Sequence, residues 1–224
     1  MLTPTRPSAN GDGGLQPPIR GLHATPAAPL PFLAGVVVRS FVLERPQGNI
    51  VVYNAPGITT AARDILKLGR LDRMLVTHWH EAMFGAPALD VPIHVHANDR
   101  AQTDLPIADT FSEREMIADD LEVIPTPGHT RGTTMFLWDN GEHRMLFPGD
   151  SVWVQGGVWK AVLLGESDRA AYLDSLSCLA ELDFDVLVPW GSEEGQPTAY
   201  GVTRAQARQN IERIMDRLRQ GEFA

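Results

Sequence analysis

The chain has 224 residues, enough for one sizeable domain, and its 43% hydrophobic and 21% charged residues are typical of a globular protein. Its net charge of −9 argues against a nucleic-acid-binding surface, because contacts with phosphates require clustered Lys and Arg. The single cysteine, Cys178, excludes an intramolecular disulfide framework and fits a reducing compartment. No apolar run reaches the roughly 18 residues of a membrane helix, and the N-terminal residues lack the apolar stretch of a signal peptide. We therefore expect a cytoplasmic protein that binds neither nucleic acid nor membranes.

The first part of the chain differs in composition from the rest. Residues 1–31 are rich in Gly and Pro, and such a segment buries too little apolar surface to offset the entropy lost on ordering. We expect an extended or disordered leader over residues 1–31 and a single domain over residues 32–224.

After the leader, hydrophobic patterning predicts short strands mixed with helices. The expected strands cover residues 36–43, 49–54, 74–77, 93–96, 121–125, 133–138, 143–147 and 186–189. The expected helices cover residues 59–68, residues 167–182 and the segment from Thr203 to Leu218. Asp139-Asn140-Gly141 predicts a hairpin turn, and Gln206 completes a capping box with Thr203. Hairpins combined with alternating strands and helices predict a layered α/β fold with mixed sheets.

Four of the expected strands are followed directly by residues that are unusual in a loop. These segments are His78-Trp79-His80, Thr126-Pro127-Gly128-His129-Thr130, Pro148-Gly149-Asp150 and Pro189-Trp190-Gly191. Open α/β sheets gather ligand-binding loops at the ends of their strands, so these segments are expected to converge. Three imidazoles and one carboxylate in one place suit Zn²⁺, which prefers nitrogen ligands supplemented by carboxylate.

The order of these segments carries a resemblance to a known family. Thr77-His78-Trp79-His80, Thr126-Pro127-Gly128-His129-Thr130 and Leu146-Phe147-Pro148-Gly149-Asp150 resemble, in this order, the motifs of the metallo-β-lactamase fold superfamily. The resemblance covers roughly residues 35–215 and implies a four-layer αβ/βα sandwich with mixed sheets and a metal site at one edge between them. Family members are mostly hydrolases of esters, thioesters, amides and phosphoesters, so it also implies a small-molecule substrate.

The chain departs from the family pattern at the second metal. The positions of the second-metal aspartate and histidine are Ala82 and Met83, and the segment Pro189–Ser192 lacks the family's last metal histidine. The resemblance therefore implies a single-metal hydrolase, with one Zn²⁺ on the ligands that remain, and Asp150 as fourth ligand or as the catalytic group that orients water. The remaining ligands are His78, His80, His129 and Asp150.

The sequence leaves an alternative of a different class open: a catalytically degenerate member, with no metal, that serves as a binding or interaction module. Three glutamates are close enough in sequence to replace a lost ligand: Glu81, Glu193 and Glu194. His94 and His96 are expected to pack or hydrogen-bond within a strand rather than to bind metal. The substrate and the oligomeric state are not specified by the sequence.

Three tryptophans also lie near the predicted site residues. Trp79, Trp153 and Trp190 form either an aromatic pocket for an apolar group or a filling for the volume of lost ligands.

Overall fold

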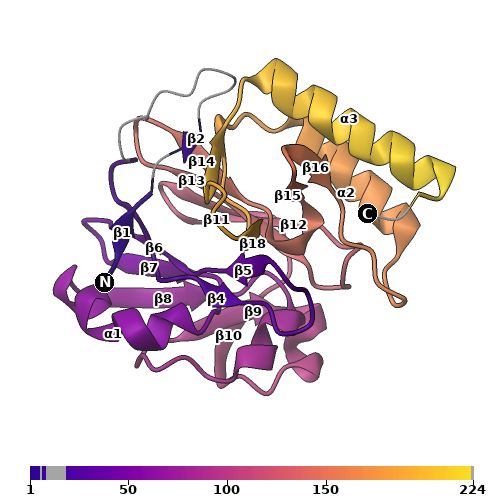
Figure 1. Ribbon diagram of the computed structural model, residues 1–224. Coiled ribbons are helices and arrows are strands. Elements are labelled where there is room, and N and C mark those ends of the chain that lie inside the picture. The colour runs from indigo at the N-terminus through magenta and orange to yellow at the C-terminus, as the bar shows by residue number, and fades with distance from the viewer. Residues whose placement is uncertain (6, 9–18, 223–224) are drawn as a thin grey trace.

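The computed structural model describes residues 1–5, 7–8 and 19–222 of the chain. Its strands form two seven-stranded sheets and one five-stranded sheet, and helices cover the outer faces of the two larger sheets (Figure 1). The helices are α1 (Gly57–Lys67), α2 (Arg169–Glu181), α3 (Arg204–Gln220) and three short 3-10 helices, η1 (Trp79–Phe84), η2 (Ala97–Gln102) and η3 (Gly149–Ser151). The layers follow the order helix, sheet, sheet, helix, which confirms the predicted four-layer αβ/βα sandwich with mixed sheets.

The first seven-stranded sheet has α1 on its outer face (Figure 1). Its strands, in spatial order, are β1 (Thr3–Pro4), β3 (Leu22–Ala24), β6 (Phe41–Leu43), β7 (Asn49–Val52), β8 (Leu71–Leu75), β9 (Ile93–His96) and β10 (Ile107–Phe111). Helix α1 connects the parallel strands β7 and β8, as a crossover connection requires. Its apolar stripe of Ile58, Ala61 and Ile65 packs on Val51 and Met74 of these strands.

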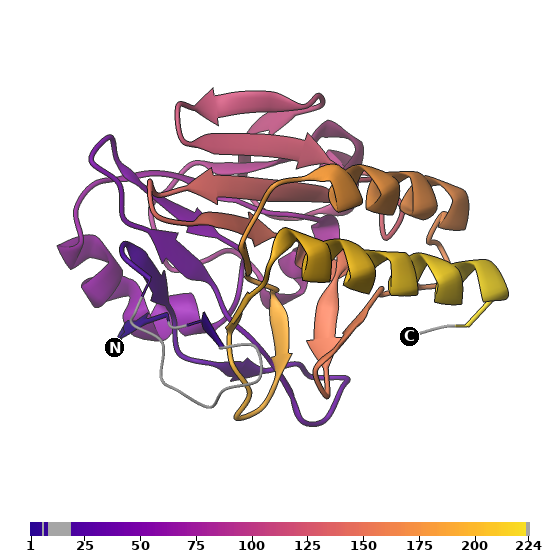
Figure 2. The same ribbon diagram turned by 90° about the horizontal axis from the view of Figure 1, so that it is seen from above.

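The second seven-stranded sheet carries α2 and α3, which lie side by side on its outer face (Figure 2). Its strands, in spatial order, are β11 (Glu115–Ala118), β12 (Leu121–Pro125), β13 (Thr134–Asp139), β14 (Arg144–Phe147), β17 (Val186–Leu187), β19 (Ala199–Gly201) and β2 (Pro7–Ser8). The expected capping box begins α3: the Thr203 hydroxyl accepts a hydrogen bond from the Gln206 amide N. No helix in the described part of the chain is long and apolar enough to cross a membrane.

The five-stranded sheet is built from short segments that are far apart in the chain. Its strands, in spatial order, are β16 (Val158–Lys160), β15 (Trp153–Gln155), β18 (Gly191–Glu193), β5 (Val36–Val38) and β4 (Ala28–Pro29). We did not predict β15, β16 and β18 from the sequence, because strands of three residues show no measurable periodicity.

The main core lies between the two larger sheets. Strand β7 shows how it is built: Ile50 and Val52 point into this core, whereas Val51 points toward α1. In β13 Phe136 faces the same core, whereas Leu137 packs under α2 and α3. Both faces of these strands are apolar because each sheet is covered on both sides.

The N-terminal segment differs from the expectation that it buries little surface. Strands β1, β2 and β4 are the end strands of the three sheets, and Leu22 and Ala24 of β3 are buried. Each of the three end strands contains a proline, which is tolerated at a sheet edge because its missing N–H faces away from the sheet. The division of the chain at residue 31 itself stays a prediction, and its residues 6 and 9–18 lie outside the described residues.

Candidate metal centre

Three histidines from two loops converge at the edge where the two larger sheets meet. His78 and His80 follow β8, His129 follows β12, and one ring nitrogen from each lies within 4.8 Å of the others. The Nδ1 atom of His80 is 3.0 Å from Nε2 of His129, although the residues are 49 positions apart. The strand ends therefore bring these three predicted ligands together.

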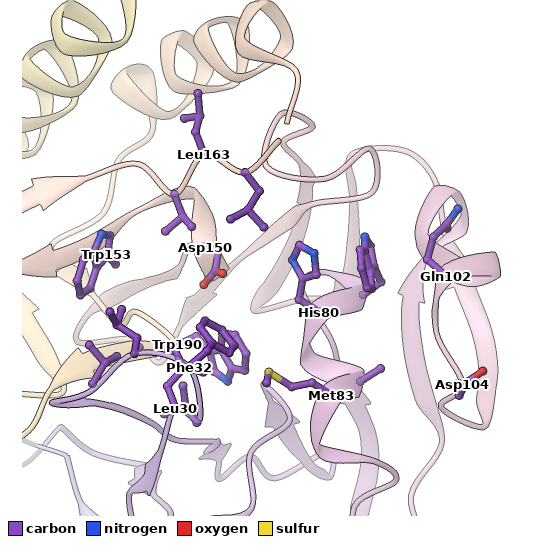
Figure 3. Close-up of a pocket in the computed structure, with 18 residues that line it drawn as sticks. Leu30, Phe32, His80, Met83, Gln102, Asp104, Asp150, Trp153, Leu163 and Trp190 are labelled. Atoms are coloured by element: carbon purple, nitrogen blue, oxygen red, sulfur yellow. The ribbon is translucent and has the colours of Figure 1, made fainter. Parts of the chain in front are cut away.

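Asp150 lies next to two of these histidines. Its Oδ2 atom is 3.4 Å from His78 Nε2 and 3.5 Å from His129 Nε2, and Figure 3 shows the side chain facing His80. Asp150 belongs to η3, directly after Gly149. Gly149 has φ of 55°, and a Cβ there would overlap the Thr77 hydroxyl, so only glycine lets this turn approach the histidine loop.

In each ring, the nitrogen that points away from the other two histidines lies next to a polar atom outside the cluster. His129 Nδ1 donates a hydrogen bond to the Val162 carbonyl O at 2.8 Å, and His80 Nε2 lies 3.3 Å from Glu166 Oε1. His78 Nδ1 is 3.0 Å from the Thr77 hydroxyl. Partners of this kind fix the tautomer of metal-binding histidines and direct the second nitrogen toward the metal.

One nitrogen in the cluster lacks a hydrogen bond. His78 is fully buried, and its Nε2 atom makes no well-formed hydrogen bond among the described residues, since Asp150 Oδ2 lies 3.4 Å away. An orphaned polar atom in a buried place is costly unless something binds it. The donor set of three imidazoles and one carboxylate fits a divalent ion such as Zn²⁺, and the orphaned nitrogen points to the same conclusion.

The electrostatics of the cluster favour neutral rings at His80 and His129 beside an ionised Asp150 carboxylate. Burial lowers the pKa of His129 to about 4 and also lowers the pKa of His80. Burial opposes ionisation of Asp150, yet the neighbouring imidazoles bring its pKa down to about 2. Burial works against protonation of His78 as well, but the Asp150 carboxylate raises the pKa of this ring above its ordinary value. Deprotonated histidine and carboxylate are the forms that bind metals.

Two residues that support the cluster were missed in the sequence. Asp99 of η2 is buried and accepts hydrogen bonds from the amide N of Trp79, the amide N of Gly132 and the Thr130 hydroxyl. Asp99 thus fixes the His80 loop against the His129 loop. Glu166, beside His80, precedes α2. Neither residue stands in a motif, so only the fold reveals their roles.

Glu81 does not supply a replacement ligand in the structure. Its fully buried carboxylate accepts hydrogen bonds from the amide N atoms of Asn54 and Thr77, and from the Thr77 hydroxyl at 2.5 Å. Glu81 therefore holds Thr77 in place, and the Thr77 hydroxyl in turn contacts the His78 ring. Glu193 accepts a hydrogen bond from the Gly156 amide N instead.

The other histidines named from the sequence also have roles outside the cluster. His96 accepts a hydrogen bond from the Asn98 amide N at the start of η2, and His94 is half-buried in β9. Neither belongs to the group of converging ring nitrogens found in the described part of the chain.

A pocket of about 670 Å³ opens beside the cluster, and His80 and Asp150 line it (Figure 3). Trp79, Trp153 and Trp190 line it as well, which favours an aromatic pocket over a simple filling of lost volume. The Trp190 ring also packs edge-on against His78, with ring centroids 5.5 Å apart.

The fold and the motifs agree with comparisons to known proteins. Residues 81–191 match the model of the Metallo-beta-lactamase superfamily. No curated protein sequence matches the chain significantly. Among solved structures, a metallo-beta-lactamase from Pontibacter korlensis is similar, with a TM-score of 0.64 at 15% identity over 90% of this chain and 96% of that one.

Two further structures show the same fold. An archaeal metallo-beta-lactamase superfamily protein, ST1585 from Sulfolobus tokodaii, gives a TM-score of 0.59 at 19% identity over 88% of this chain and 86% of that one. VMB-1 gives a TM-score of 0.69 at 13% identity over 98% of this chain and 99% of that one. The motifs, the sandwich and the family match together show that the chain belongs to the metallo-β-lactamase superfamily.

Proposed function

We propose that this chain is a metal-dependent hydrolase that works with a single Zn²⁺ held by His78, His80 and His129. The observation that carries the proposal is the convergence of one ring nitrogen from each of the three histidines within 4.8 Å, with the Asp150 carboxylate beside His78. Each of the three rings has an outer partner that orients it. Such preorganised rings are typical of functional metal sites.

The side chains around the cluster support one ion rather than two. Ala82 offers only a methyl group, and the Met83 thioether is a soft ligand that suits Cu(I) better than Zn²⁺. Trp190 and Gly191, at the start of β18, offer no ligand atom in their side chains. A second ion would keep only Asp150, which is too few protein groups to hold it.

Asp150 is the proposed catalytic residue. A bound Zn²⁺ supplies Lewis-acid chemistry, since it acidifies water and polarises a carbonyl or phosphoryl oxygen. The Asp150 carboxylate, ionised and directed into the pocket, accepts a hydrogen bond from the attacking water and orients it. Its contact with His78 and His129 also allows it to serve as the fourth ligand.

The names of structural neighbours support this class of reaction. The proteins from Pontibacter korlensis and Elizabethkingia meningoseptica are both described as metallo-beta-lactamases, which are hydrolases. For this chain we propose hydrolysis of a small molecule, without carrying over the lactam substrate. Its cytoplasmic location stays a prediction.

Elemental analysis of the purified chain tests the proposal. After incubation with zinc and removal of excess metal, we expect one Zn²⁺ per chain, lost in His129→Ala and retained in the control His94→Ala. Two tightly bound ions would show that the single-metal proposal is wrong. A chain that binds no metal would favour a non-catalytic binding module, and hydrolysis by the metal-free chain would contradict the mechanism.

A further inference from the structure

The pocket beside the histidine cluster is built for an apolar ligand. Eight large apolar side chains are exposed in the described part of the chain, and half of them line this one pocket: Phe32, Leu33, Met83 and Leu164. Exposed apolar side chains gathered at one place mark a binding site, whereas scattered ones need no explanation. The volume of about 670 Å³ is in the range of pockets that hold small organic ligands.

The apolar surface reaches the reacting groups directly. His80 and Met83 both belong to η1, a 3-10 helix, in which residues three apart lie on the same face. Figure 3 shows both side chains directed toward the pocket, with Asp150 across from His80. A ligand that contacts His80 and Asp150 with its polar group therefore places its remaining atoms against Met83 and its apolar neighbours.

The side chains of the pocket wall offer no cationic partner to an anionic group. None of its described lining residues is Lys or Arg, and two of them, Asp104 and Asp150, are acidic. The chain as a whole carries a net charge of −9. A carboxylate, phosphate or sulfonate would lose its hydration without gaining a cationic side chain as partner, which is costly.

We propose that the substrate is an uncharged carboxylic ester with an apolar acyl chain, which the pocket binds against Met83, Phe32 and Leu164. This substrate class rests on the hydrolase function proposed above. The ester carbonyl lies beside His80 and Asp150, where the polar groups of the pocket gather. The acyl chain extends along the apolar wall and displaces water from it.

The reaction with this substrate balances with water alone. The oxygen of water bonds to the carbonyl carbon, the ester C–O bond breaks, and the alcohol leaves with one proton. The second proton of water passes to solvent, so the other product is a carboxylate.

A binding measurement separates the pocket from the chemistry. The probe is the dialkyl ketone in which a methylene replaces the ester oxygen of ethyl hexanoate, and the comparison is hexanoate, the charged acid of the same acyl chain. Three tryptophans line the pocket, so intrinsic fluorescence reports occupancy without a label. In the full chain treated with a chelator, we expect the ketone to bind at least tenfold more tightly than hexanoate. A ketone with an acyl side two methylenes shorter should bind about 15-fold more weakly, since each buried methylene contributes roughly fourfold.

A charge placed in the wall provides the decisive variant. Met83 is 44% exposed, so Met83→Lys should fold, and it should weaken ketone binding at least fivefold while strengthening hexanoate binding. The matched control is Met116→Lys on β11, where the methionine is 57% exposed and outside the pocket lining, and it should change neither affinity.

The outcomes distinguish this inference from the proposed function. Hexanoate binding as tight as ketone binding, no binding of either probe, or a Met83→Lys variant that behaves as Met116→Lys would overturn the substrate class. Zinc binding with any of these results leaves the hydrolase proposal standing. Ketone binding by a chain that takes up no zinc even when it is incubated with zinc shows instead that the pocket is as inferred and that the hydrolase proposal is wrong.

Discussion

Asp99 accepts a hydrogen bond at 2.7 Å from the hydroxyl of Thr130, although 31 positions separate the two residues. The same carboxylate accepts hydrogen bonds from the amide N atoms of Trp79 and Gly132. The loops that carry His80 and His129 are thus joined through a buried group that lies outside the histidine cluster.

The first prediction concerns this link. Asp99→Ala should lower the free energy of unfolding by about 3 kcal/mol or more, because three donors in a buried place lose their acceptor. It should also weaken zinc binding by about 10- to 100-fold, the usual effect of removing a group that orients metal ligands. Urea unfolding and zinc titration measure the two effects. The control Asp119→Ala, at an exposed position, should change neither; equal behaviour of the two variants would contradict the role of Asp99.

The second prediction compares two glycines with the same backbone conformation. Gly149 and Gly156 both have φ of 55°. A Cβ added at Gly149 would overlap Thr77, whereas a Cβ added at Gly156 would have no described atom within 4 Å. Both alanine variants suffer the strain of a positive φ, about 1 kcal/mol. Only Gly149→Ala should displace Thr77 and with it the ring of His78, and so weaken zinc binding. Calorimetric zinc titration of the two variants side by side gives the answer, and equal affinities would show that the close approach of this turn is unimportant.

The third prediction is a dependence of stability on pH. Burial opposes ionisation of Asp120, yet its hydrogen bonds from Arg45 and Trp138 hold the pKa of its carboxyl below the ordinary value. Because the folded pKa lies below the unfolded one of about 3.9, this stabilisation is complete above that pH and is lost as pH falls through the folded pKa. Asp120→Asn should therefore cost about 1–2 kcal/mol at neutral pH and progressively less below about pH 4. Urea unfolding across this range measures the gap, which should stay near zero for Asp119→Asn at every pH.

The fourth prediction concerns the N-terminal segment. Leu22 is fully buried in β3, so Leu22→Ala should lower the free energy of unfolding by about 2–5 kcal/mol. Leu66→Ala provides the same chemical change on α1, at a side chain that is 58% exposed, and should cost less than about 0.5 kcal/mol. Similar small losses for both variants in urea unfolding would mean that the N-terminal strands add little to the stability of the sandwich.

Much of the fold could be predicted because the hydrophobic and capping patterns of single segments agree with the strands and helices that they form in the sandwich. Strands β9 and β12 begin and end at the predicted residues, and the Thr203 capping box marks the start of α3. The gathering of His78, His80 and His129 was also predictable, because each follows a strand and strand ends converge.

Other features depend on contacts that no local pattern encodes. Strand β5 pairs with β18, so Val37 and Ser192 are neighbours although most of the chain lies between them. The Gly- and Pro-rich composition of residues 1–31 predicts an extended or disordered leader, but single edge strands need a partner on one side only and tolerate proline. Asp99 and Glu166 contact other side chains of the site, Thr130 and His80, rather than a ligand. Their roles therefore become visible only when the loops are assembled.

The pairing of β2 with β19 has a consequence for the order in which the chain can fold. Pro7 and Ser8 lie beside Ala199 and Tyr200, which are synthesised 192 positions later (199 − 7). The second sheet therefore cannot add β2 to its edge until β19 has been synthesised and has emerged. Contacts of such high sequence separation slow folding, because a long loop must close before the pairing stabilises it. Strand β2 accordingly waits unpaired while most of the sandwich is synthesised, and the nascent chain depends on its other strands and helices until then.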